Sequence, residues 1–237
     1  PLIGAGDAVE QSASYFAWRT IFRTLFKLGD SPSTTVAQPQ IMAELVSDPS
    51  LLQRAPLLNA VLPLSLPDTD LTKQMEQEVR ADNTRELLVH LFEREVAEKE
   101  LLIIIEDAHW LDTASWALLA QLRRELPEMM LVLVTRPMAV NHRGAAGELE
   151  VPPEYVRLHQ DPATQMIRLG PLSAEETAEL ACQRLGVSTL PESAQTLIWE
   201  QSEGHPFFSQ EIVYNLRDSG ALEVKEQQVR FVAENGN

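Results

Sequence analysis

The chain has 237 residues, of which 44% are hydrophobic and 23% charged, so it can fold around a core without disulfides or a structural metal. Its 19 basic and 35 acidic residues give a net charge of −16, which argues against binding of this segment to nucleic acid or to an anionic membrane surface. The single cysteine, Cys182, cannot form an internal disulfide, and we therefore expect a reducing, cytoplasmic location.

The sequence has no feature of membrane insertion or secretion. Its apolar runs, such as Leu101–Ile105, are far shorter than the roughly 18 residues that a membrane span needs. The first residues have neither a basic leader nor the long apolar core of a signal peptide. They also lack an initiator Met, so we expect the chain to be a fragment of a longer protein.

Apolar periodicity predicts helices in the first hundred residues. Between Ser14 and Leu28 apolar residues recur at three- and four-residue spacing, and Gly29 supplies a stop. Prolines interrupt the next stretch repeatedly, which predicts a small insertion of short helices over residues 31–80. A helical apolar face returns from Thr84 to Glu98.

Two segments break the helical pattern and predict a parallel β-sheet. Leu101–Ile105 and Met130–Val134 are short, continuously apolar and partly β-branched, as strands are when helices cover both their faces. Asp112 lies between them and can cap an intervening helix. The order helix, strand, helix, strand predicts an α/β fold.

The rest of the chain predicts a second, mainly helical region. Residues 138–165 are rich in Pro, Gly and charge and are expected to form a loop or linker, and Met166–Leu169 is a candidate strand. Ser173 begins a capping box, S-A-E-E, for a helix that Gly186 ends. With two further helices, this region is expected to form a domain over 166–220. The alternating residues within 221–237 predict a hairpin or the start of another domain.

The segment with most chemical information follows the first predicted strand. Glu106 and Asp107 would stand at the carboxyl edge of the sheet, where open α/β folds bind their ligands. Paired acids there can hold a hydrated Mg²⁺ and orient a water molecule, although two acids that simply meet solvent would give the same pattern. His109 and Asp112 lie in the same turn, but no second histidine accompanies them. We therefore expect no zinc or iron site.

Three motifs occur in a fixed order: EDAHWLD, LVLVTRP and SEGHPFFSQEI. With the opening GAGDAVEQSASYFAWRTIF, they resemble the STAND branch of the AAA-like P-loop ATPases, and in particular the modules beside class III adenylyl and guanylyl cyclase domains, as in the soluble adenylyl cyclases. The resemblance runs from about Leu2 to Gly220. It implies a partial P-loop NTPase core over 1–137, a helical lid over 166–220 and the start of a possible winged-helix hairpin.

The resemblance also implies roles for individual residues. Glu106 and Asp107 stand at the Walker B acids, with Glu106 toward Mg²⁺ and Asp107 polarising the attacking water. The family more often has Asp at the first position, where this chain has Glu106. Thr135 and Arg136 correspond to the sensor of the γ-phosphate, although a strand that ends in an exposed Arg would look the same.

The third motif contains the G-x-P of the family's lid, formed here by Gly204, His205 and Pro206. In related proteins the proline packs on adenine. Together with the Walker B acids, the resemblance therefore implies ATP or ADP with Mg²⁺ as cofactors. A turn between two helices would satisfy the same Gly and Pro, and both interpretations can hold.

The phosphate-loop motif that a P-loop ATPase needs to bind its nucleotide is absent from these 237 residues. A phosphate loop has the pattern G-x-x-x-x-G-K-[ST], and Gly4 and Gly6 have the wrong spacing for it. The resemblance places that loop and its strand before Pro1, with the strand beside the one that ends at Thr135.

Two hypotheses follow for the function. The first is an ATP-binding signalling ATPase with slow hydrolysis as a switch, inactive as this fragment, with covalently linked effector domains such as a cyclase and with ATP-dependent self-association. The alternative is a noncatalytic regulatory scaffold. A separate hydrolase with its own triad is not expected, because no nucleophile turn of the G-x-S-x-G type occurs.

Overall fold

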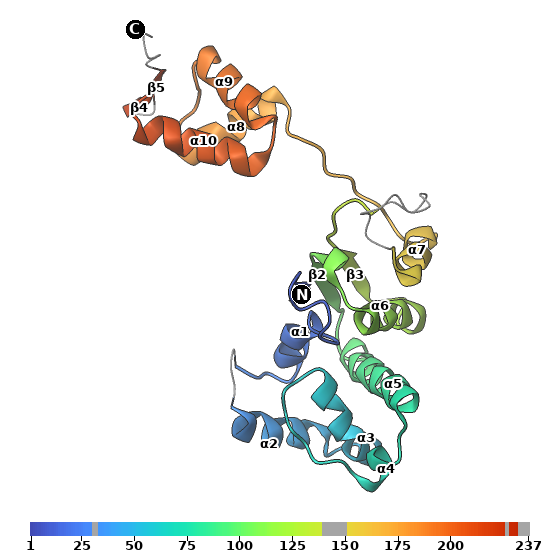
Figure 1. The fold of residues 1–237 in the computed structure, drawn as a ribbon. Coiled ribbons are helices and arrows are strands. Elements are labelled where there is room, and N and C mark those ends of the chain that lie inside the picture. Colours follow the sequence, from blue (N-terminus) through green and yellow to red (C-terminus); the bar gives the residue numbers. More distant parts are fainter. Residues whose placement is uncertain (30–32, 139–150, 226–227, 232–237) are drawn as a thin grey trace. The chain divides into compact units, whose positions relative to one another are not determined.

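The structure is a computed structural model that describes residues 1–29, 33–138, 151–225 and 228–231. The chain divides into two compact units, Pro1–Gln165 and Met166–Asn237, and each is described by itself (Figure 1). Among the described residues, no helix is both long enough and apolar enough to cross a membrane.

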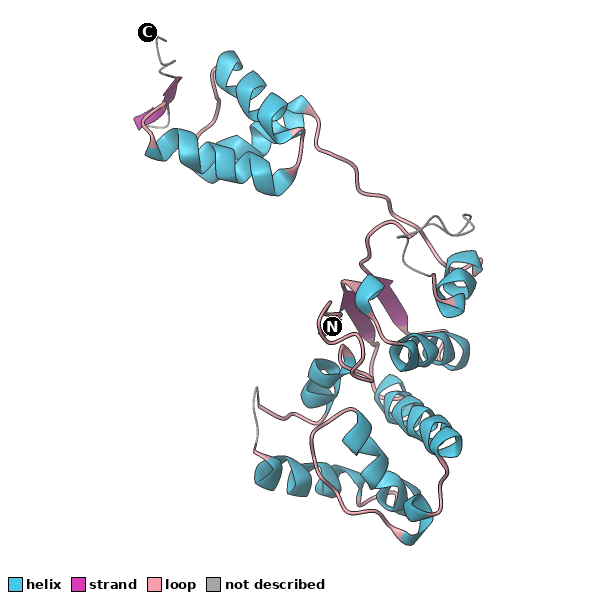
Figure 2. Ribbon diagram, in the orientation of Figure 1, coloured by secondary structure: helices cyan, strands magenta, loops and turns pink. Residues whose placement is uncertain are grey.

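The first unit is built on a three-stranded parallel sheet in the order β1-β2-β3 (Figure 2). The strands are β1 (Leu2–Ala5), β2 (Leu102–Glu106) and β3 (Met130–Leu133). Central β2 buries Ile103 and Ile105 completely. The predictions of β2 and β3 are confirmed, whereas β1 was not predicted because its four residues, LIGA, are too short to show a strand pattern.

Helices α1 (Trp18–Leu25) and α5 (Gln77–Val96) contribute an aromatic centre to the core of this unit. The ring of Phe92 lies 5.9 Å from that of Trp18 and 5.2 Å from that of Phe22, between centroids, and all three side chains are fully buried. Helix α1 begins later than the predicted Ser14, because Tyr15 has a left-handed backbone that is incompatible with a helix.

The segment between these helices is the predicted helical insertion. Its elements are α2 (Thr34–Leu45), α3 (Pro49–Arg54), the 3-10 helix η1 (Ala55–Ala60) and α4 (Asp70–Lys73). Pro49 and Pro56 lie in the first turns of their helices, where proline is favoured. Pro39 instead lies inside α2, so the prediction of short helices interrupted by prolines does not hold at this position.

Helix α6 (Thr113–Glu125) follows residues 106–112, which we call the acidic turn because they begin with Glu106 and Asp107. Helix α7 (Pro153–Gln160) packs against α6. The rings of Trp116 and Tyr155 meet edge to face at 5.8 Å between centroids. The prediction of a loop or linker over 138–165 was therefore wrong where α7 forms. Pro153 marked a loop in the sequence, but a proline in the first turn also starts a helix. The remainder of this prediction, residues 139–150, lies outside the described residues.

The second unit contains a three-helix cluster and a hairpin. Its elements are α8 (Ala174–Leu185), α9 (Glu192–Ser202), α10 (Pro206–Asp218), β4 (Leu222–Lys225) and β5 (Gln228–Phe231), which pairs antiparallel with β4. The capping box of Ser173 and Glu176 and the left-handed Gly186 are confirmed. The prediction of a strand at Met166–Leu169 was wrong. Leu169 is 88% exposed, and a lone apolar segment without a partner strand forms no ladder.

Candidate functional site

Two acids stand at the carboxyl end of β2. Glu106 is the last residue of the strand and Asp107 the first after it, and both are exposed. The backbone of Asp107 is left-handed, with φ 49° and ψ 40°, a conformation that non-glycine residues adopt infrequently. The next N–H, that of Ala108, donates to the carbonyl of Val134 at 2.8 Å. The turn that presents the acids is thus fixed to the tip of β3.

The chain after β1 fixes the other side of this turn. The Gly6 N–H donates to the Glu106 carbonyl at 2.9 Å. A Cβ atom on Gly6 would lie 2.5 Å from the Asp107 carbonyl oxygen, which is closer than any side chain permits. Gly4 is similarly constrained, since its Cβ would lie 2.2 Å from the carbonyl oxygen of Ala17. The two glycines that fail as a phosphate loop are therefore positions of close packing, a role that sequence reasoning missed.

The imidazole of His109 connects the acidic turn with Arg136. Its side chain is only 1% exposed, and its Nδ1 lies 4.0 Å from Oδ1 of Asp107. The Arg136 N–H donates to the same Nδ1 at 3.5 Å. The Nε2 atom is buried and makes no hydrogen bond within the described residues. Asp107 and the backbone of Arg136 thus lie beside one buried ring at the carboxyl edge of the sheet.

Asp112 has more contacts than a helix cap requires. Its Oδ1 accepts the Ser115 N–H at 3.0 Å, which confirms the predicted cap of α6. Its Oδ2 accepts the hydroxyl of Ser115 and, at 3.0 Å, the N–H of Tyr15. Burial raises the pKa of Tyr15 to about 12, against the lowering effect of Arg85, and the charge of Asp112 adds to the increase. Nothing local in the sequence indicates the hydrogen bond between Tyr15 and Asp112, since these residues are 97 positions apart.

The donor set at this edge suits a hard cation that keeps its water. Within the described ranges, no group of three or more His, Cys, Asp or Glu side chains could hold a metal ion. Mg²⁺ needs no such group, because it is commonly held by one or two carboxylates together with water and phosphate oxygens. The exposed carboxylates of Glu106 and Asp107 fit that kind of binding.

The predicted lid turn lies in the second unit. Gly204 has a φ of 72°, and a Cβ there would lie 2.3 Å from the Leu172 carbonyl oxygen. The Leu172 N–H donates to the Gly204 carbonyl at 2.8 Å, and Pro206 begins α10. His205 contacts the ring of Phe208 at 4.6 Å between centroids. The glycine and proline are therefore accounted for by the turn itself, whatever further role they have.

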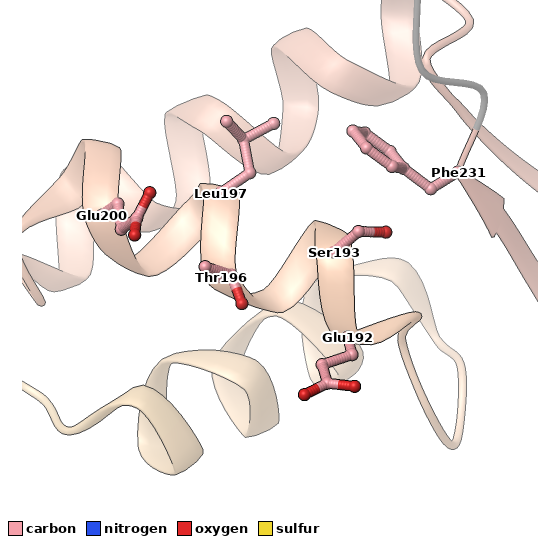
Figure 3. A pocket seen from close by; sticks show the side chains of 6 residues that line it. All are labelled: Glu192, Ser193, Thr196, Leu197, Glu200 and Phe231. Atoms are coloured by element: carbon pink, nitrogen blue, oxygen red, sulfur yellow. The ribbon is translucent and has the colours of Figure 1, made fainter.

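An open hollow of about 560 Å³ lies beside α9 in the same unit. Figure 3 shows Phe231, from the end of β5, opposite the side chains of α9. The residues that line the hollow are Glu192, Ser193, Thr196, Leu197, Glu200 and Phe231. None of them is a predicted site residue, and the two carboxylates would repel a triphosphate. We do not assign the nucleotide to this hollow.

Two family profiles match the chain. A family described as an AAA ATPase domain matches residues 2–134, which covers the sheet, the acidic turn and the end of β3. A family described as a domain of unknown function matches residues 173–230, which covers α8 to β5.

The curated relatives include several proteins named adenylate cyclase type 10. The protein from Rattus norvegicus is 26% identical over 160 residues, which are 68% of this chain and 9% of the relative. The protein from Mus musculus is 24% identical over 160 residues, again 68% of this chain and 9% of the relative. The protein from Homo sapiens is 23% identical over 166 residues, which are 70% of this chain and 10% of the relative. The chain thus spans about a tenth of the length of these relatives. No solved structure matches it significantly.

Proposed function

The chain belongs to the AAA ATPase domain family, and from that premise we propose that it supplies the metal and sensor side of an ATP site in a larger regulatory protein. Slow hydrolysis of ATP would switch the state of that protein. The observation that carries the proposal is the acidic turn at the carboxyl edge of the sheet, which is fastened to both neighbouring strands. Such fixed geometry suits carboxylates that position a metal and a water molecule.

Each residue of the site has a role in this proposal. Glu106 would hold Mg²⁺, largely through water, and Asp107 would accept a hydrogen bond from the water that attacks the γ-phosphate. The bound Mg²⁺ would neutralise charge that develops on the phosphate oxygens. Thr135 and Arg136, at the tip of β3, would contact the γ-phosphate.

We place the adenine contact in the second unit. Gly204, His205 and Pro206 would form the lid turn that packs on the base, and the proline ring offers the apolar surface. Support comes from the resemblance of the motif G-H-P to the G-x-P of the family's lid and from the position of Pro206 at the start of α10.

The proposal is tested with a chain extended at its N-terminus to include a phosphate loop. Glu106→Gln combined with Asp107→Asn should abolish Mg²⁺-dependent hydrolysis of ATP, with a loss of at least about 100-fold in kcat. The control is Glu98→Gln combined with Glu100→Gln, which removes the same charge just before the amino end of β2. Unchanged turnover in the first variant would show that these acids are not the catalytic pair. For residues 1–237 alone we expect negligible hydrolysis.

A noncatalytic regulatory scaffold is the second candidate. It is favoured by Glu106 at a position where the family more often has aspartate. The reading frame upstream of Pro1 distinguishes the two. A phosphate-loop motif there favours the ATPase, and a start codon without such a motif favours the scaffold.

The partners in this proposal follow from the relatives. Because the similar proteins are named adenylate cyclases, we propose covalently linked effector domains, of which a cyclase is one kind. A cytoplasmic location and self-association when ATP is bound complete the proposal. Size-exclusion chromatography of the extended chain with and without ATP and Mg²⁺ tests the self-association.

A further inference from the structure

The loop between β1 and α1 is attached to the acidic turn at two places. At its start, Gly6 lies against Asp107 and donates to the Glu106 carbonyl. At its end, the Tyr15 N–H donates to Asp112 at 3.0 Å. The residues between these points, 7–14, are largely exposed. The loop therefore projects from the same sheet edge as the acids and is held there at both ends.

The end at Tyr15 depends on one acceptor. Tyr15 is 4% exposed and has a φ of 58°, in the left-handed region that is unfavourable for a non-glycine residue. Its N–H has the Asp112 carboxylate as its partner, and a buried N–H without a partner is costly. The strained backbone at Tyr15 is thus maintained by a contact that reaches across to the acidic turn.

The helix cap alone does not require an aspartate at position 112. Serine, threonine or asparagine would cap α6 as well, because a cap needs one oxygen that accepts an N–H from the first turn. Asp112 has two acceptor oxygens and uses both, one for the Ser115 N–H and one for Tyr15. The second oxygen accepts the Ser115 hydroxyl as well as the Tyr15 N–H, and the bond from Tyr15 is the tertiary contact.

We propose that Asp112 is a positioning residue that joins the 6–15 loop to the acidic turn, so that Asp107 is held between the loop and β3. Asp112 acts through the turn 107–111 and touches neither metal nor phosphate. The effect of Asp112 on hydrolysis rests on the proposed function. The attachment of the 6–15 loop to the acidic turn through Asp112 is a property of the chain and is measurable without nucleotide.

The decisive variant in the 237-residue chain is Asp112→Asn, which keeps size and shape but leaves one acceptor oxygen for two N–H groups. Asparagine is as good a cap as aspartate, so we expect its oxygen to remain on Ser115 and its NH₂ to face the Tyr15 N–H. Hydrogen exchange of the Tyr15 amide, read by two-dimensional NMR, should then speed up at least about tenfold. Resonances of Gly6 and of Asp107–Trp110 should shift, while α6 keeps its protection.

Ser115→Ala is the matched control. It removes the hydroxyl that also donates to Oδ2 of Asp112, but it leaves the Tyr15 contact and the cap in place. Tyr15 should stay protected in this variant. Asp112→Ser provides a second route if Asp112→Asn does not fold, because its shorter side chain can cap α6 but cannot reach Tyr15.

Two results would overturn the proposal. One is a protected Tyr15 amide and unshifted Asp107 resonances in Asp112→Asn. The other is an equal loss of protection along α6, which would reduce Asp112 to a cap. In the extended chain, Asp112→Asn should lower kcat about tenfold with little change in the KM for ATP. If the unmutated extended chain hydrolyses no ATP, the proposed function fails, and the NMR result still decides the positioning role.

Discussion

Asp107 presents its carboxylate from a backbone conformation that most side chains avoid. At φ 49° and ψ 40°, Asn and Asp are tolerated, whereas a β-branched residue is strained. We expect Asp107→Asn to leave the free energy of unfolding within about 0.5 kcal/mol of wild type and Asp107→Val to lower it by about 1–2 kcal/mol. Urea denaturation measures both. Glu106→Val is the control, because Glu106 has strand geometry that valine adopts readily. Equal stability of the two Asp107 variants would contradict the expectation.

Tyr15 predicts how stability depends on alkaline pH. Its pKa of about 12 in the folded chain, raised mainly by burial, exceeds the ordinary value of 10.0, so the folded state holds the phenolic proton more tightly than the unfolded state does. The resulting stability is present in full below pH 10 and is lost between pH 10 and about 12. From pH 8 to 11 the wild type should lose about 1 kcal/mol more than Tyr15→Phe. Parallel pH dependences in urea titrations would show that the phenol ionises equally in both states.

At the scale of single elements, the position of β1 depends on the missing side chain of Gly4. Gly4 brings the strand within contact of α1, and a Cβ there would overlap the Ala17 carbonyl. We expect Gly4→Ala to lower the free energy of unfolding by about 1–3 kcal/mol, because either α1 or the strand must move. Gly29→Ala is the control, since no described residue lies within 4 Å of the position that its methyl group would take and its φ is not left-handed. A Gly4→Ala variant as stable as Gly29→Ala would rule out this close contact.

Elements with a dense local signal were predictable from the sequence. The apolar runs of β2 and β3 and the capping box of α8 each indicate one kind of structure, and the strand order then places Glu106 near Thr135. Three features depend on long-range contacts and were missed. Strand β1 exists because β2 pairs with it, α7 because Tyr155 finds Trp116, and the second contact of Asp112 because Tyr15 lies 97 residues away.

At the scale of the molecule, the sheet of the first unit is unevenly protected. Parallel sheets are normally covered, yet within the described ranges β3 pairs on one side only, with β2. Its first residue, Met130, is 63% exposed, and Val134, just beyond its end, is 43% exposed. An apolar strand with an unpaired edge is a template for another strand. The net charge of −16 opposes such pairing through repulsion between copies.

These opposing effects predict salt-dependent self-association of the 237-residue chain through β3. Raising the salt concentration screens the repulsion and leaves the apolar edge unchanged, so sedimentation velocity should show more dimer at high salt. Met130→Lys places a charge beside any added strand and should weaken association about tenfold, or ~1.4 kcal/mol. Val36→Lys, at a 57% exposed position on α2, changes the net charge by the same amount and should not weaken association. Because either lysine reduces the net negative charge, general repulsion would make both variants associate more strongly, and weakening by Met130→Lys alone identifies the edge of β3 as the contact.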